Sequence, residues 1–400
     1  MKKVFPILCL YFVNGISFFI LIPVLPFIVQ SYGASKIWYS ILIASFSAAQ
    51  FIGSAWLGKL SDIYGRKKIL ILSQAGTLLS WLIFSGAYFV DQNFLGLAFA
   101  PLLVIGISRL TDGLTGGNNS VAGAYIADLI PPKERPQYFG YVGAAFGLAM
   151  IIGPTLGGFS SSFSIGYLGT ALVATLISFV TLLSLFGLKE SLSVQHRAPH
   201  TKFSLLQHLQ LWKKIRHFSN NKFVLNIFNI NGTFSFVMSG YSSIIALYII
   251  DLFQFTPKEL GFFFLASGVF MMINQTFVLK LFLKKFGPLK TLMLGQLALF
   301  VGLLLFTIPV NIGVFVGLYY FINLGISLSF PTIKSLLSHA VDQTKQGEAS
   351  GLNESISSIM AVFSPILTGF LYVTIGGYTF VIIALILLFE IFYFQTLRRL

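Results

Sequence analysis

Charged residues are scarce in this sequence of 400 residues: they make up 10% of it, whereas hydrophobic residues make up 56%. Such a composition excludes a soluble globular domain. Cysteine is almost missing, and the single Cys9 cannot form an internal disulfide. The cysteine and the five histidines show no metal-ligand spacing, so we expect neither a metal site nor a cofactor.

A nucleotide-binding loop is missing too. Gly53 and Gly58-Lys59 imitate the spacing of a phosphate loop, but Leu60 stands where a Ser or Thr would hold magnesium, and no strand precedes it. We therefore expect that the chain is not an enzyme and has no ATP site.

Long apolar runs fill most of the sequence. A membrane-spanning helix needs about 20 predominantly apolar residues. The sequence therefore predicts an all-α membrane protein with twelve transmembrane helices, and because the first span follows Lys2 and Lys3 directly, we expect no cleaved signal peptide. The twelve runs lie near residues 4–30, 37–57, 69–89, 96–127, 138–163, 167–188, 223–250, 257–279, 290–308, 311–338, 350–374 and 377–397.

The net charge of +14 is explained better by membrane topology than by a nucleic-acid partner. Of the 26 Lys and Arg residues, 23 lie at the termini or in the loops that follow even-numbered spans, including the adjoining helix ends. Lys36 and Lys258 lie on the opposite side, and Arg109 lies inside a span. Because basic residues concentrate on the cytoplasmic side of a membrane, we expect both termini in the cytoplasm.

The second half of the chain repeats features of the first. Lys36 and Lys258 open spans 2 and 8 and stand 222 residues apart, and the same offset carries Gly65 onto Gly287. We expect two pseudo-symmetric six-helix bundles around a central cavity. Residues 1–188 and 223–400 would form the bundles, and residues 189–222 a basic cytoplasmic linker.

The linker contains a short apolar pattern. Leu205, Leu209, Trp212 and Ile215 recur at helical spacing, which predicts an amphipathic helix on the inner membrane surface. A flexible basic tether is the alternative, and neither interpretation implies chemistry.

The turn between the second and third spans is short and basic. It reads Gly-Lys-Leu-Ser-Asp-Ile-Tyr-Gly-Arg-Lys-Lys-Ile-Leu over residues 58–70. Gly58 and Gly65 let helix ends approach and the chain turn, and Asp62 lies among cations and helix ends, where it can latch moving parts. The pattern resembles the loop between helices 2 and 3 of the major facilitator superfamily, especially of its drug/proton antiporters.

Charges of both signs are expected at this face of the membrane, where a salt-bridge network would gate the inward opening. Exposed pairs contribute only about 0–1 kcal/mol each, so a gate needs a partly buried network, and a solvated charge cluster is the alternative. The predicted network contains Asp62, Arg66, Lys67, Asp128, Glu134 and Arg135.

Arg109 and Asp112 lie deep in the fourth span. They share one helix face, and an ion in hydrocarbon costs from about 3 to over 10 kcal/mol unless it faces a cavity or a counterion. Arg109 matches an arginine of the superfamily's span-4 motif, R-x-x-Q-G in outline, which the resemblance associates with proton coupling. Asp112 replaces the Gln of that motif and adds a group that can bind and release a proton. A structural ion pair and direct substrate contact are the alternatives.

The fifth span ends in Gly153-Pro154-x-x-Gly157-Gly158, which resembles the signature of antiporters within the superfamily, although Ala149 stands where the fuller pattern has Gly. The resemblance implies a segment that seals the outer face and favours exchange over uniport. Close packing of small residues is the alternative. Glycines four residues apart, at 113 and 117 and at 143 and 147, also predict close helix packing.

The tract from Gly116 to Gly158 looks most like bacterial tetracycline/proton antiporters, and a weaker resemblance extends over the chain. This resemblance implies the bacterial inner membrane. Three positions that carry proton chemistry in those pumps differ here: the span-1 acid is Asn14, the span-8 histidine is Met271, and the span-9 aspartate is Leu299. These side chains cannot take up protons, so Asp112 is the best remaining candidate and tetracycline is a doubtful substrate.

Spans 1, 4, 7 and 10 line the cavity in this superfamily. Here they supply uncharged polar groups among many Phe, which suit a neutral or zwitterionic amphiphile, with Arg109 available to an anionic group. Each residue taken singly is more often a packing residue than a ligand contact. The candidates are Asn14, Ser17, Asn118, Asn119, Asn229, Asn231, Ser235, Tyr241, Tyr319, Tyr320 and Asn323.

Three other charges in or near spans are expected to be structural. Lys334 and Glu354 lie at similar depth in consecutive spans and should form an ion pair, and Glu390 should reach the membrane interface.

The sequence therefore predicts a monomeric secondary transporter in the lipid bilayer that exports an amphiphilic small molecule in exchange for protons by alternating access. The alternatives are a proton-independent facilitator or metabolite importer of the same fold, and a receptor or scaffold that does not transport.

Overall fold

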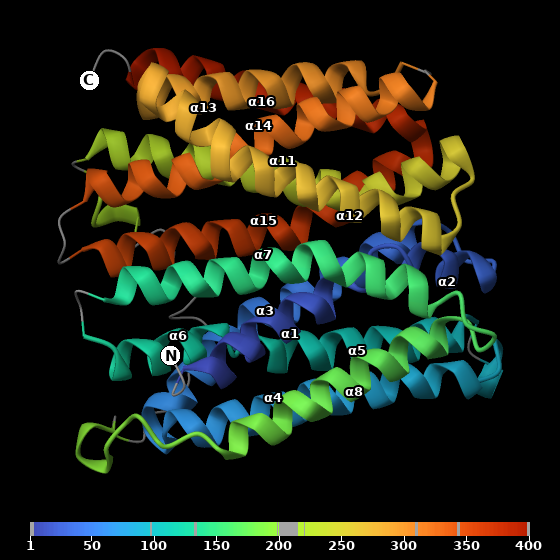
Figure 1. Ribbon diagram of the computed structural model, residues 1–400. Helices are drawn as coiled ribbons and strands as arrows, with labels where there is room; N and C mark the ends of the chain where they lie inside the picture. The colour runs from blue at the N-terminus through green and yellow to red at the C-terminus, as the bar shows by residue number, and fades with distance from the viewer. Residues whose placement is uncertain are drawn as a thin grey trace. The chain divides into compact units, whose positions relative to one another are not determined.

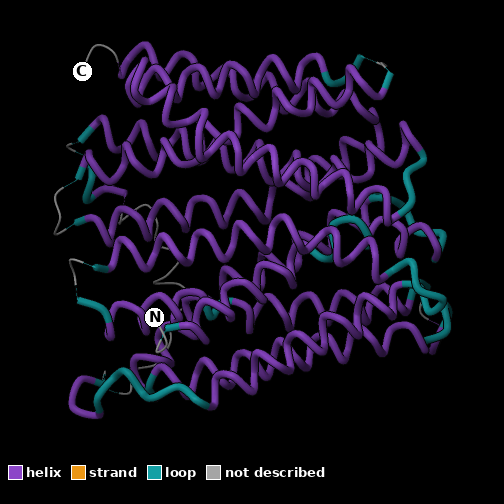
Figure 2. The backbone as a smooth tube through the Cα atoms, in the orientation of Figure 1, coloured by secondary structure: helices purple, strands orange, loops and turns teal. Residues whose placement is uncertain are grey.

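The computed structural model describes residues 4–96, 98–131, 134–197, 199, 215–219, 221–308, 311–341 and 345–397. Within these residues every regular element is a helix, and no strand occurs (Figure 2). The chain divides into two compact units, Met1–His208 with Gln254–Leu265, and Leu209–Phe253 with Ala266–Leu400. The amphipathic helix predicted around residues 205–215 lies outside the described residues, apart from Ile215.

The first unit is built from the helices of the N-terminal half and the start of α12 (Figure 1). Its α-helices are α1 (Phe5–Phe19), α2 (Leu25–Ser31), α3 (Ile37–Tyr64), α4 (Arg66–Gly86), α5 (Ala100–Gly116), α6 (Asn119–Leu129), α7 (Arg135–Ser160) and α8 (Tyr167–Phe186). Short 3₁₀ turns lie at η1 (Ala87–Phe89), η2 (Phe94–Gly96) and η3 (Val194–His196).

The second unit contains the remaining helices. They are α11 (Lys222–Phe253), most of α12 (Pro257–Ile273), the π-helical turn η4 (Asn274–Val278), α13 (Leu279–Leu305), α14 (Ile312–Ala340), α15 (Gln346–Ile375), the 3₁₀ turn η5 (Gly376–Tyr378) and α16 (Thr379–Leu397).

Most of the predicted membrane spans coincide with long apolar helices. Eight stretches of the described chain are long and apolar enough to cross a membrane, judged by length and composition. Two of these stretches, Pro257–Leu305 and Glu348–Leu388, contain Gly287 and Gly376, whose positive φ angles separate two helices in each. The first and fourth predicted runs form pairs of shorter helices, α1 with α2 and α5 with α6. The predicted all-α membrane fold is therefore confirmed.

Two glycine turns show the repeat in the backbone itself. Gly65, between α3 and α4, has φ 99° and ψ 151°, and Gly287 has φ 72° and ψ 172°. Gly166, before α8, and Gly376, after α15, share φ 57° and ψ −136°. Glycine reaches positive φ at little cost, whereas other residues are strained there. The two halves therefore repeat their turns as well as their apolar runs.

Glycines bring helix backbones together within each unit. A Cβ atom on Gly113 would lie 2.7 Å from the Ala49 Cβ, and one on Gly53 would lie 2.8 Å from the Leu114 Cα. In the second unit, a Cβ atom on Gly325 would lie 2.6 Å from the backbone nitrogen of Leu299. Such contacts let α3 pack against α5, and α13 against α14, without intervening side chains.

The predicted close packing is wrong at Gly143 and Gly147. A Cβ atom at either position would have no described neighbour within 4 Å. Their spacing matches that of the packed glycines, but the face of α7 that carries them packs against no described helix of the first unit.

The difference between Gly113, which is closely packed, and Gly143, which is not, leads to a prediction about stability. We expect Gly113→Ala to lower the free energy of unfolding by about 1–3 kcal/mol, because the added methyl group overpacks the α3–α5 contact. Gly143→Ala is the matched control and should be neutral or stabilising by up to about 1 kcal/mol, because alanine favours helix and meets no neighbour. Thermal unfolding in detergent measures both variants, and equal changes in midpoint would contradict the packing argument.

Candidate functional site

A buried ion pair lies in α5. Arg109 Nη1 is 3.2 Å from Asp112 Oδ2, and the two side chains are only 3% and 2% exposed. The helix places both groups on one face because they are three residues apart. The structure therefore brings together the two charges that the sequence placed deep in the fourth span, and both face the interior of the first unit.

Three aromatic rings surround the guanidinium group of Arg109. Its Cζ atom lies 5.0 Å from the ring centroid of Trp81, 5.7 Å from that of Phe84 and 5.8 Å from that of Phe46. Trp81 and Phe84 belong to α4, and Phe46 belongs to α3. Cation–π attraction contributes about 0.5–2 kcal/mol per ring and partly replaces the hydration that the cation loses on burial.

The pair leaves hydrogen-bonding capacity unused. The hydroxyl groups of Thr77 and Ser80 on α4 interact with the Asp112 carboxyl group. Among the described residues, however, Asp112 Oδ2 and Arg109 Nε and Nη2 have no hydrogen-bond partner. Buried polar atoms in proteins are nearly always bonded. Water or a substrate group can therefore bind at these three atoms, and a proton can bind at Asp112 Oδ2, which otherwise forms only the ion pair with Arg109.

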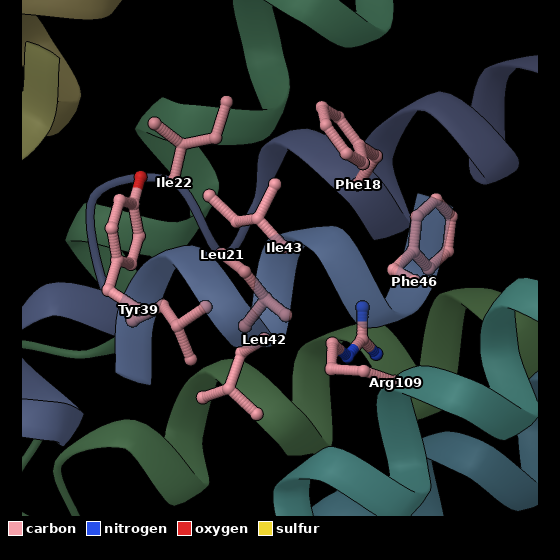
Figure 3. Close-up of a pocket in the computed structure, with 9 residues that line it drawn as sticks. Phe18, Leu21, Ile22, Tyr39, Leu42, Ile43, Phe46 and Arg109 are labelled. Atoms are coloured by element: carbon pink, nitrogen blue, oxygen red, sulfur yellow. The ribbon is translucent and has the colours of Figure 1, made fainter. Parts of the chain in front are cut away.

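A small cavity of about 30 Å³ lies beside Arg109 (Figure 3). The guanidinium group lies at its edge near Leu42 and Phe46, and Arg109 is its only charged lining residue in the described chain. The volume suits a water molecule. Its other walls are Phe18, Leu21, Ile22, Leu25, Tyr39 and Ile43.

The predicted cavity residues of spans 1 and 4 bond to one another. Asn14 Nδ2 donates to Asn118 Oδ1 at 2.6 Å and to Asn119 Oδ1 at 2.9 Å. Trp81 Nε1 donates to Ser17 Oγ at 3.2 Å. These bonds tie α1 to α4 and to the break between α5 and α6, so in this structure the four predicted residues join helices.

In the second unit, α11 is tied to α15 in a similar way. Asn231 Nδ2 donates to the Asn353 carbonyl oxygen at 3.1 Å and to Ser357 Oγ at 2.9 Å. The hydroxyl of Ser235 also lies 2.9 Å from Ser357 Oγ. Asn229, in contrast, is exposed. Two of the predicted residues on α11 thus face α15, whereas Asn229 does not take part in this contact.

A second polar group of this unit surrounds Tyr319. Ser267 Oγ donates to the Tyr319 hydroxyl at 3.0 Å and lies 3.4 Å from Asn323 Oδ1. The Tyr241 ring lies 6.5 Å from the Tyr319 ring, and the two hydroxyl groups interact. Tyr320 is partly exposed. Tyr241, Ser267, Tyr319 and Asn323 therefore form one buried polar group in the second unit.

The segment that resembles the antiporter signature packs tightly in α7. A Cβ atom on Gly153 would lie 3.3 Å from the Ile20 backbone nitrogen, and one on Gly157 would collide with the Ile20 carbonyl oxygen. A Cβ atom on Gly158 would collide with the backbone of residues 254–265, which belong to the same unit. Small residues are therefore needed at all three positions for close packing.

Arg66 links the charges at the turn between α3 and α4. Its Nη1 donates to Asp62 Oδ1 at 2.5 Å and to Ser61 Oγ at 2.7 Å, and its Nε donates to Asp128 Oδ2 at 3.2 Å. Ser191 Oγ donates to the same Asp128 oxygen at 2.9 Å. The Arg66 side chain is 11% exposed, so the network is partly buried, as the gating hypothesis requires.

Glu190 completes this network, although its place in the sequence predicted no role for it. Its Oε1 accepts from the backbone N–H of Arg66 at 2.9 Å, and its Oε2 accepts from that of Lys67 at 3.2 Å. A carboxylate at a helix N-terminus satisfies free N–H groups and favours the helix dipole. A Cβ atom on Gly65 would collide with this carboxylate. The available signal in the sequence was a single acid in a basic linker.

Glu134 and Arg135 lie outside the network in the described part of the chain. Arg135 Nη2 donates to the Ala127 carbonyl oxygen at 2.7 Å, and its Nε donates to that of Ile130 at 3.1 Å. Glu134 is exposed. Lys67 Nζ donates to a backbone carbonyl of α8 instead of a carboxylate. The predicted cluster therefore reduces to Asp62, Arg66 and Asp128, with Glu190 added.

The remaining charges give one confirmed and one wrong prediction. Lys334 Nζ lies 3.9 Å from Glu354 Oε2, and both side chains are exposed, so the expected ion pair forms. Glu390 does not reach the interface: it is only 1% exposed, because α16 turns this residue toward the interior together with Phe380, Ile383 and Leu387.

Comparison with known proteins shows the family. The sequence matches the Major Facilitator Superfamily over residues 7–365. The chain belongs to this superfamily. It is thus a multi-pass membrane protein of a family of secondary transporters, and the resemblance of its 58–70 loop to that family is confirmed.

Superfamily members with resistance functions are among its relatives. The class H tetracycline resistance protein of Pasteurella multocida is 26% identical over 381 residues, which cover 93% of this chain and 89% of that protein. Multidrug resistance protein 2 of Bacillus subtilis (strain 168) is 29% identical over 371 residues, which cover 90% and 86%. The structure of the human organic anion transporter MFSD10 shares the fold, with a TM-score of 0.72, 20% identity, and coverage of 98% and 99%.

The Glu190 contact predicts a local change in this superfamily member. We expect Glu190→Gln to weaken the start of α4 by about 0.5–2 kcal/mol, the range for loss of a helix cap. Hydrogen exchange at the Arg66 and Lys67 amides should accelerate accordingly. Glu134→Gln removes an exposed acid and is the matched control. Unchanged exchange at both amides in Glu190→Gln would show that the carboxylate does not hold the helix end.

Proposed function

We propose that this chain exports an amphiphilic small molecule across the bacterial inner membrane in exchange for protons, by alternating access. The observation that carries the proposal is the buried Arg109–Asp112 pair, three of whose polar atoms have no hydrogen-bond partner among the described residues. The names of the tetracycline and multidrug resistance relatives support export of drug-like compounds. The aromatic surroundings of the pair suit the apolar part of such a molecule.

Asp112 is the proposed proton-binding residue, and Arg109 modulates it. Its Oδ2 lies 3.2 Å from Arg109 Nη1 but has no hydrogen-bond partner among the described residues, and its site is closed to bulk water. A proton on this oxygen and a substrate N–H or O–H group that donates to it exclude one another. Mutual exclusion at one atom is what exchange requires, because the proton that arrives displaces the substrate and the substrate that arrives displaces the proton.

The loop network is the proposed inner gate. Asp62, Arg66 and Asp128 form a partly buried set of charges at one end of the first unit. Breaking this set exposes its charges to water, so its cost is modest and suits a gate that opens in every cycle. The closely packed Gly153–Gly158 segment is the proposed outer seal. We further propose that both termini lie in the cytoplasm and that the protein works as a monomer.

A proton-independent facilitator is the second candidate. The resemblance to tetracycline/proton antiporters implies three proton-binding positions, which are Asn14, Met271 and Leu299 in this chain. Asn14 uses its amide to bond Asn118 and Asn119, and Leu299 is fully buried against Gly325. None of these three side chains can bind a proton. Transport would therefore be independent of protons if Asp112 serves only as the ion-pair partner of Arg109. A receptor without transport would bind ligand and move none.

The two transport mechanisms separate in proteoliposomes. We expect an imposed pH gradient to drive uptake of ethidium, tetracycline or a quinolone, and Asp112→Asn to abolish this gradient-driven uptake while counterflow without a gradient persists. Asp91→Asn changes an exposed loop acid and is the matched control. Equal gradient-driven rates in Asp112→Asn and the wild type would exclude Asp112 as the coupling site. Absence of any flux for all three probes would count against drug export itself.

A further inference from the structure

A second buried acid lies in the second unit, on the mostly apolar helix α16. Glu390 is 1% exposed, and its carboxyl group lies against the backbone of Phe234 in α11. Neither carboxyl oxygen has a side-chain or backbone partner with hydrogen-bond geometry among the described residues. In the described chain, Glu390 and Asp112 are the buried acids, and Asp112 alone has a buried arginine beside it.

Gln296 lies at the same depth on the neighbouring helix α13. The rings of Phe306 and Phe380 are 5.3 Å apart, which sets the register between α13 and the antiparallel α16. Gln296 comes ten residues before Phe306, and Glu390 comes ten residues after Phe380. At 1.5 Å per residue, both therefore lie about 15 Å along the helices from this contact. Gln296 is also buried, and neither atom of its amide has a described partner.

In the first unit, a similar register brings a glutamine side chain into contact with the neighbouring helix. The rings of Phe84 on α4 and Tyr167 on α8 are 6.1 Å apart. Gln74, ten residues before Phe84, donates from Nε2 to the carbonyl oxygen of Ser178, eleven residues after Tyr167, at 3.1 Å. Gln74 and Gln296 stand 222 residues apart, at the offset of the internal repeat. In the second unit the corresponding glutamine, Gln296, faces α16, the helix that carries the carboxyl group of Glu390.

No described cation neutralises Glu390 from the helices packed against α16. The charged groups of those helices are exposed, and the buried tyrosines lie nearer the opposite end: Tyr248 bonds the Phe306 carbonyl oxygen, and Tyr372 bonds Asp251. An ionised carboxylate without a counterion is far more costly in such a place than a neutral acid. The exposed charged groups are Lys222 and Asp251 on α11, Lys280, Lys284, Lys285 and Lys290 on α13, and Glu348 and Glu354 on α15, and the titratable groups also include Tyr241 on α11 and Tyr378 on η5.

We propose that Glu390 is a proton-binding site of the second unit, with Gln296 as its polar partner. At neutral pH the residue is a carboxylic acid, and the glutamine amide offers an acceptor for its O–H group and a donor for its carbonyl oxygen. The site is separate from the Arg109–Asp112 pair, and it holds whether or not the protein exchanges drugs for protons. Its proton can leave only when water reaches this depth between α16 and its neighbours.

Infrared spectroscopy of the purified protein in lipid tests the proposal directly. In Asp112→Asn protein at pH 7, the C=O stretch of a protonated carboxylic acid should remain and should shift in D₂O. It should disappear in Asp112→Asn/Glu390→Gln protein. Asp112→Asn/Glu348→Gln removes an exposed acid instead and should leave the band unchanged. A band that is absent in Asp112→Asn protein, or that survives Glu390→Gln, would overturn the proposal.

The partner role and the fold are checked separately. Gln296→Leu in the Asp112→Asn background keeps the acid and should shift its band to the frequency of a less hydrogen-bonded carboxyl group. An unmoved band would remove Gln296 from the site. Glu390→Gln has the shape of the neutral acid, so its thermal midpoint at pH 6 should match the wild type. A drop at pH 6 larger than that of Glu348→Gln would indicate that the native residue is ionised and paired.

Discussion

A charge inside an apolar helical bundle is stable only where other groups replace its lost hydration. Arg109 meets this condition with one carboxylate from its own helix and three rings from two others. These partners work only if α3, α4 and α5 stay within contact distance. The glycine contacts beside the pair keep the helices this close. Gly113 follows Asp112 directly, and a Cβ atom at Gly113 would collide with the backbone of Phe46. Close packing and ion pairing are thus one requirement in this unit, because a wider helix spacing would leave the arginine without its rings.

One helix, α4, contacts both charged regions of the first unit. α4 begins with Arg66, whose side chain joins Asp62 and Asp128, and it continues to Thr77, Ser80 and Trp81 beside the buried pair. The two regions are about 22 Å apart along the axis, at 1.5 Å per residue over fifteen residues. A displacement of α4 as a rigid element therefore changes both at once. Glu190 holds the first turn of this helix through two backbone N–H groups, so the chain that leaves α8 takes part in setting the position of α4.

Local rules predicted much of this arrangement. Apolar run lengths predicted the spans, a three-residue spacing predicted the Arg109–Asp112 pair, and the Gly65–Gly287 offset predicted a shared turn geometry. Contacts that depend on three-dimensional placement were not accessible. Glu190 meets Arg66 across 124 residues of chain, and nothing near it in the sequence marks it as a helix cap. The burial of Glu390 depends on how α16 is rotated, and an almost uniformly apolar helix has no polar face from which that rotation could be inferred. Gly143 and Gly147 failed for the same reason, because spacing does not say which face a neighbour occupies.

The internal repeat preserves backbone geometry while the chemistry of the two units differs. Gly65 and Gly287 keep their unusual dihedral angles, yet Asp62 corresponds to Lys284 at the 222-residue offset, so the acid of the loop network has no counterpart there. The buried acids differ in the same manner. Asp112 lies beside a permanent cation, so its proton affinity depends on what else binds that cation. Glu390 faces α13, which offers the neutral side-chain amide of Gln296, so its proton affinity depends on whether water reaches it. If both acids bind protons, the first responds to a ligand and the second to hydration of its own unit, and the two responses need not occur at the same step.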